Sequence, residues 1–146
     1  MKRLQRLVQA TEYFNEFRLE GATCSIVVDQ DNAISVLANV SGDQLLISLP
    51  EESESGRTTD DWSGRLSVAM FAIAKINGPA RTPELARATY ARLLTLAQAA
   101  VAKLSDDMTA GGCRMLAGIS LTGLNVVPEY SIFGGWSGYS IELTLD

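Results

Sequence analysis

One long helical pattern, placed between segments of alternating polarity, constrains the fold most. Thr82 is a good helix cap, Pro83 suits the first helical turn, and Glu84 favours the positive end of a helix. Apolar side chains then recur every three or four residues, which places them on one face: Ala86, Tyr90, Leu93, Ala97, Ala100 and Leu104. The sequence therefore predicts a continuous helix of roughly six turns, ended by the Met-Thr-Ala-Gly-Gly stretch at 108–112.

Strands are predicted on both sides of this helix, because apolar residues alternate there with others at a period of two. The alternating segments are residues 24–28, 45–49, 66–76, 113–121 and 139–145. Pro50 stops the second of them, and Asn77-Gly-Pro79 turns the chain after the third. A loop around Pro128 is expected between the last two strands.

Two further segments have helical spacing. Leu4, Leu7, Val8, Thr11, Phe14 and Phe17 share one face, and Gly21 supplies a stop. Residues 33–40 favour a short helix that begins at Asp31 or Asn32 and ends at Gly42, although alternation of Ile34 and Val36 leaves a strand open. The acidic segment 51–62 is predicted to be an exposed loop.

The predicted order of elements is α-β-(α)-β-β-α-β-β. This order indicates an α+β fold: a single, mostly antiparallel sheet with helices packed on one face. The strands on either side of 51–62 are expected to form a long-looped hairpin, and the final two strands a second one. Residues 1–146 are predicted to form a single domain.

Composition narrows the class of protein. A hydrophobic share of 47% with 20% charged residues is typical of a globular chain. The net charge of −5 argues against non-specific nucleic-acid binding, which rests on basic residues. No apolar run reaches the ~20 residues of a membrane span. The basic start of the chain is interrupted by Glu12 and Glu16, so we expect no signal peptide and a cytoplasmic location.

Catalytic chemistry is scarce. The chain has no histidine, which removes the usual activator of serine and cysteine nucleophiles. A nucleophile-elbow pattern at Gly135-Trp-Ser137-Gly fails because residue 139 is tyrosine. Cys24 and Cys113 are expected to be buried, reduced and structural. We therefore predict no catalytic residue, no cofactor and no metal. A metal-dependent hydrolase using Asp60 or Asp61 is the last alternative.

Binding surfaces are better candidates. Tyr130, Phe133, Trp136 and Tyr139 fall within ten residues, spaced by glycines, and together with Trp62 they form the predicted interface. The alternative that this loop covers its own core stays open. The long helix also offers a second, alanine-rich face that suits close packing by another subunit: Ala86, Ala88, Ala91, Ala97, Ala99, Ala100 and Ala102.

The order of these pieces resembles that of small tail-assembly proteins of long-tailed phages and prophages, especially tail-terminator and head-tail joining proteins. The resemblance rests on DNAISVLANV at 31–40, LLISLPEE at 45–52 with Pro50 after the strand, and GWSGYSIELTLD at 135–146, where Gly135-Trp136 opens the last strand.

The resemblance implies an α+β structural protein, not an enzyme, that forms a homo-oligomeric ring, commonly a hexamer, at the end of the tail tube. It implies contacts with other tail or connector proteins, and a place in the virion or in the bacterial cytoplasm. It implies no membrane and no sequence-specific nucleic acid as partners. A small-ligand or regulatory binding module, with a pocket beside the Trp136 loop, is the alternative.

Overall fold

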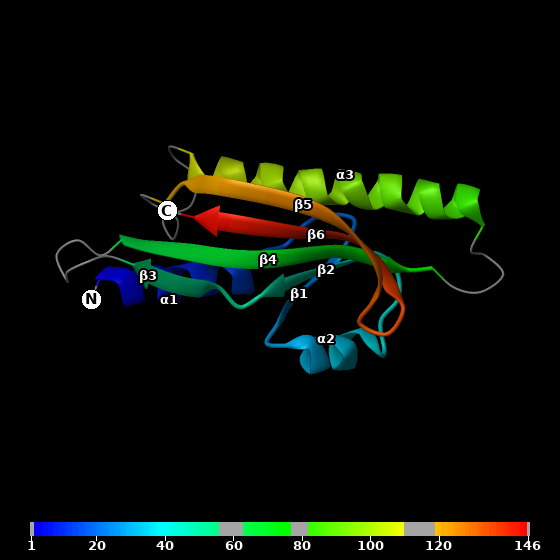
Figure 1. Ribbon diagram of the computed structural model, residues 1–146, viewed down its shortest axis with the longest axis horizontal. Coiled ribbons are helices and arrows are strands. Elements are labelled where there is room, and N and C mark those ends of the chain that lie inside the picture. Colours follow the sequence, from blue (N-terminus) through cyan, green and yellow to red (C-terminus); the bar gives the residue numbers. More distant parts are fainter. Residues whose placement is uncertain (1, 56–62, 77–81, 110–118, 146) are drawn as a thin grey trace.

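The computed structural model describes residues 2–55, 63–76, 82–109 and 119–145. Figure 1 shows a twisted sheet with helices packed against it, which confirms the α+β class. Along the chain the elements are α1 (Lys2–Asn15), β1 (Thr23–Val27), α2 (Gln30–Leu37), β2 (Gln44–Ser48), β3 (Glu51–Ser55), β4 (Ser63–Lys75), α3 (Pro83–Met108), β5 (Leu121–Ile132) and β6 (Trp136–Leu145).

The sheet has six strands in the order β1-β2-β4-β6-β5, and β3 pairs with the first part of β4. Among the described strands, only β1 and β2 run parallel, joined by α2; the other pairs are antiparallel, as predicted. The first expected hairpin is present as the β2–β4 pair, with β3 between the two strands in sequence. β5 and β6 also form a hairpin, but its first strand is Leu121–Ile132 and not the predicted 113–121.

The two faces of the sheet have separate cores, because successive residues of a strand point to opposite sides. On the first face, α1 and α3 pack over Leu45, Met70 and Ile141. On the second face, α2 packs over an end of the sheet that includes Leu46 and Ile73. The helices were expected on one face. The β1-α2-β2 crossover instead carries α2 to the other face, where these apolar side chains need cover.

The three predicted helices are confirmed, with capping groups that explain where two of them begin. The Asp29 carboxylate accepts a hydrogen bond from the Asn32 backbone N–H at 2.8 Å, so α2 begins at Gln30, slightly earlier than predicted. The Thr82 hydroxyl accepts one from the Leu85 N–H at 3.2 Å, which fixes the predicted start of α3.

Two predicted loops are strands. Glu51–Ser55 forms β3, so an exposed loop over the whole of 51–62 was wrong; residues 56–62 lie outside the described part. β3 is held by backbone hydrogen bonds to β4, which do not require apolar side chains. Charged side chains are common on strands at a sheet edge. The expected loop around Pro128 lies inside β5, because an edge strand tolerates a residue without an N–H.

Most of the strand predicted at 113–121 lies outside the described part of the chain, which omits residues 110–118. β5 begins at Leu121. The turn predicted at 77–79 also lies outside the described part. The last strand begins at Trp136, three residues before the predicted Tyr139.

Candidate functional site

The predicted aromatic interface is not one cluster. Tyr130 and Tyr139 each lie with ring centroids 5.7 Å from that of Tyr90 of α3, on the first face. Phe133 and Trp136 belong to the core cluster of the second face, where the Phe133 ring meets Phe71 edge-on at 5.1 Å. Trp62, the fifth predicted residue, lies outside the described part.

Exposure separates these residues further. Trp136 is only 2% exposed, whereas Tyr130 is 69% exposed. Tyr139 and Phe133 are half-buried against the two cores. Trp136 therefore covers the core of its own chain, which was the alternative to an interface. Among the described residues of the predicted interface, Tyr130 alone has a largely solvent-exposed side chain.

An apolar edge beside Tyr130 escaped the sequence argument. Leu124 is 51% exposed and Val126 38%, and both project from β5 toward Leu94 and Val101 of α3. A groove of about 310 Å³ runs between strand and helix, lined by Leu94, Ala97, Gln98, Val101, Ala102, Leu124 and Val126. We call Leu94, Val101, Leu124, Val126 and Tyr130 the β5–α3 edge.

Specific hydrogen bonds hold β5 in this position. The Tyr90 hydroxyl donates to the Glu129 carbonyl oxygen at 2.6 Å, which ties α3 to the strand. The Ser140 hydroxyl donates a hydrogen bond to the Glu129 carboxylate at 3.0 Å. Glu129 is the one charged residue of β5, so its side chain is already engaged within the chain. In Figure 1, β5 is the outermost strand beneath α3, and no described strand pairs with its outer side.

The alternation of Leu124 with Val126 was the signal that could have revealed this edge. The segment was instead predicted to be a loop, because it contains Pro128. The sequence also predicted a second, alanine-rich face of the long helix as a contact surface. Ala97 and Ala102 of this set line the groove, so part of the alanine-rich surface lies beside an open apolar region.

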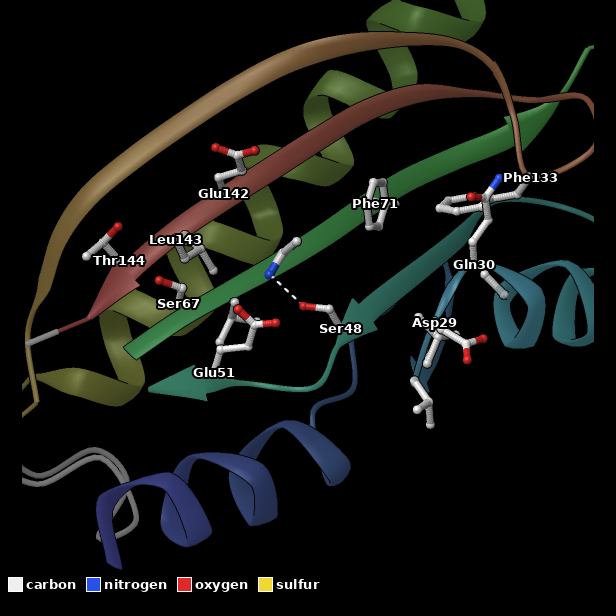
Figure 2. Close-up of a pocket in the computed structure, with 15 residues that line it drawn as sticks. Asp29, Gln30, Ser48, Glu51, Ser67, Phe71, Phe133, Glu142, Leu143 and Thr144 are labelled. Carbon is white, nitrogen blue, oxygen red and sulfur yellow. Dashed lines mark hydrogen bonds between the residues drawn. The ribbon is translucent and has the colours of Figure 1, made fainter. Parts of the chain in front are cut away.

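A second concave region lies on the other face of the sheet (Figure 2). It has a volume of about 450 Å³ and is bordered by the end of α2, by β2, β3, β4 and β6, and by Phe133 of the β5–β6 turn. Phe71 and Phe133 form an apolar wall at one end, while Asp29, Glu51 and Glu142 supply carboxylates. No basic residue is among the described residues that line it.

This region exists because the sheet has a step. β2 pairs with β4 from Met70 onward and β3 pairs with it only up to Ser67, so Ala69 has no strand neighbour on that side. The Ser48 hydroxyl fills the place by accepting the Ala69 N–H at 2.8 Å, as the dashed line in Figure 2 marks.

Catalytic candidates gain no support from their surroundings. The Ser137 hydroxyl is buried and accepts the Ser131 N–H at 2.9 Å, which is a structural role in the β5–β6 turn. Cys24 is half-buried, not buried as expected, and this partial burial raises the pKa of its thiol, which disfavours the reactive thiolate. Cys113, Asp60 and Asp61 lie outside the described part.

Within residues 2–55, 63–76, 82–109 and 119–145, no three Asp, Glu or Cys side chains gather as they would around a metal ion. None of the helices described there has the length and apolar character to cross a membrane.

Comparisons with known proteins leave the family open. No protein-family model matches the chain, and no curated protein is significantly similar to it. The function must therefore be argued from the sequence pattern and from the surfaces described above.

Proposed function

We propose that this protein is a structural assembly subunit of a phage or prophage tail. Copies of the chain would form a ring at the tail end or at the head-tail junction, as the resemblance to tail-terminator and head-tail joining proteins implies. In this proposal the activity is binding to neighbouring subunits and to other tail or connector proteins.

The β5–α3 edge is the observation that carries the proposal. Leu124, Val126, Leu94 and Tyr130 expose apolar side chains along one side of a twelve-residue strand. A contiguous apolar surface on a folded chain is typical of a protein contact. An outermost strand also presents backbone N–H and C=O groups that a partner can engage.

Charge does little to oppose a copy of the same chain as partner at this edge. The chain carries a net charge of −5, so close approach of two copies is least costly where charges are few. Within β5, Glu129 is the sole charged residue, and its carboxylate already accepts a hydrogen bond from Ser140.

Native mass measured across a dilution series, with the same samples imaged as single particles, tests the proposal. We expect closed rings with a central opening that dissociate on dilution. Leu124→Asp should raise the concentration of half-assembly at least about tenfold, because a carboxylate in the contact must be desolvated. Asn125→Asp, on the opposite face of the same strand, is the matched control and should assemble normally. A monomer at every concentration would contradict the proposal.

A small-ligand or regulatory binding module is the second candidate, favoured by the 450 Å³ region that Phe133 borders. A ligand that binds only the folded state must raise the melting temperature. A panel of small organic cations suits its carboxylate border, and Ala69→Leu, which fills the floor, should remove any shift. Equal shifts in both proteins would place the ligand elsewhere.

A further inference from the structure

The opposite edge of the sheet also carries exposed apolar side chains. Val28, directly after β1, is 68% exposed, and Leu49, directly after β2, is 39% exposed. The Leu49 N–H donates to the Val27 carbonyl oxygen at 3.3 Å, so the two residues are held next to each other. We call Val28 and Leu49 the β1-end patch.

The β1-end patch has a defined structure. The Val28 N–H donates to the Asn32 side-chain oxygen at 3.0 Å, which ties it to the first turn of α2. Its exposed side chain is therefore presented from a fixed backbone. Because β1 and β5 are the two ends of the strand order, this patch and the β5–α3 edge lie on opposite sides of one molecule.

The β1-end patch has acidic neighbours, whereas the neighbours of the β5–α3 edge include the basic Arg87 as well as the acidic Glu84 and Glu129. Asp29 and Asp31 follow Val28 closely and are both exposed. Arg87 lies seven residues before Leu94, a spacing that places both on the same side of α3. The guanidinium of Arg87 meets the Glu84 carboxylate at 3.9 Å with both side chains more than three-quarters exposed, so this weak pair leaves it available.

We propose that the β5–α3 edge of one copy docks on the β1-end patch of the next. This proposal rests on the ring assembly proposed above and names the surfaces that would build it. A contact between two different surfaces of identical chains is head-to-tail, and such contacts close into rings when the rotation permits. A contact of the β5–α3 edge with itself would instead be two-fold and would stop at a dimer.

Two variants, each with one of the two surfaces disrupted, distinguish the head-to-tail contact from the two-fold contact. Leu124→Asp disables the β5–α3 edge, and Val28→Asp disables the β1-end patch. Each variant alone should remain monomeric at concentrations where the wild type forms rings. An equimolar mixture should form dimers of one copy of each variant and no ring, because one intact contact survives between them. Native mass resolves all of these species.

Matched controls keep the measurement specific. Asn125→Asp and Ser35→Asp introduce the same charge at exposed positions of β5 and α2, outside the two surfaces, and should still form rings. Val28→Ser is a milder second variant that should weaken assembly about tenfold or more by dilution. Circular dichroism on heating checks that every variant is folded.

The outcomes separate this inference from the proposed function. Val28→Asp and Val28→Ser that assemble like the wild type would overturn it. A Val28→Asp homodimer beside a monomeric Leu124→Asp would overturn it in favour of the two-fold contact. In the first case, wild-type rings would still stand as support for the proposed function. In the second case, the wild type would stop at a dimer, which would contradict the ring assembly as well. A wild type that stays monomeric would contradict both proposals.

Discussion

At the residue scale, Gly138 is the tightest position in the sheet. A Cβ built there would lie 2.0 Å from the Ala72 carbonyl oxygen, which belongs to the neighbouring strand β4. The nearest atoms are all backbone atoms of Ala72 and Ile73, so no flexible group can move aside. The glycine therefore lets β6 approach β4 closely at the centre of the fold.

We expect Gly138→Ala to destabilise the protein by about 3 kcal/mol or more, because β6 must move away from β4. Gly42→Ala is the matched control: its site is open but has φ of +83°, so its cost should stay at about 1 to 2 kcal/mol. Urea unfolding of both variants gives the comparison. Equal losses would mean that the strands accommodate the methyl group.

Asp107 is the residue with the clearest acid sensitivity. Its carboxylate accepts a hydrogen bond from the Tyr13 hydroxyl at 2.6 Å and another from the Lys103 ammonium group at 3.1 Å. The Tyr13 hydrogen bond, helped by Lys103, lowers the pKa of Asp107 below its usual value. These contacts join α1 to the last turn of α3.

The sign of the pH dependence follows. Because the folded pKa is lowered, the carboxylate stabilises the fold fully above its unfolded pKa of about 3.9 and loses this effect as pH falls through the folded value. Asp107→Asn should therefore be less stable than wild type at pH 7, with a smaller difference at pH 3. Urea midpoints at both pH values measure this. Asp106→Asn, an exposed neighbour, should show no such change.

At the scale of elements, the step between β2 and β3 depends on one hydroxyl. Ser48→Ala would leave the half-buried Ala69 N–H without its acceptor, which costs about 0.5 to 1.5 kcal/mol. Thermal unfolding measures the loss. Ser48→Thr keeps a hydroxyl and should recover most of the stability. A stable Ser48→Ala protein would mean that water replaces the hydroxyl.

The sequence predicts best those elements in which the spacing of apolar residues matches the burial of one face. α3 and β4 are each buried on a regular face, so their apolar spacing determines them. β3 is held by backbone pairing with β4 and has no apolar period to detect. β5 has half-exposed side chains at the edge of the sheet and contains Pro128, so the sequence predicted a loop there.

At the scale of the whole molecule, stability and association belong to different aromatic residues. Trp136→Ala should lower stability by about 3 to 5 kcal/mol, since a buried ring is lost from the second core. Tyr130→Ala should leave the melting temperature nearly unchanged and weaken assembly instead. Calorimetry and native mass on both variants separate the effects. A large loss of stability in Tyr130→Ala would show that its ring serves the fold.

The candidate site was only partly predictable for the same reason. Aromatic clustering along the chain marked residues 130–139, but their division between two faces depends on the register of β5 against β6. The apolar β5–α3 edge joins a helix and a strand that are distant in sequence. No local pattern reports which face of α3 that strand reaches.

The central pairing of β4 with β6 also has a kinetic consequence. Leu66 lies opposite Leu145 and Lys75 opposite Trp136, so every contact of this ladder closes a loop of roughly 60 residues or more. The β5–β6 hairpin needs only a short turn. In pulse-labelled hydrogen exchange we therefore expect the amides of the β5–β6 hairpin to gain protection before the β4 amides that bond to β6. The fold would then be completed from its outer edge inward.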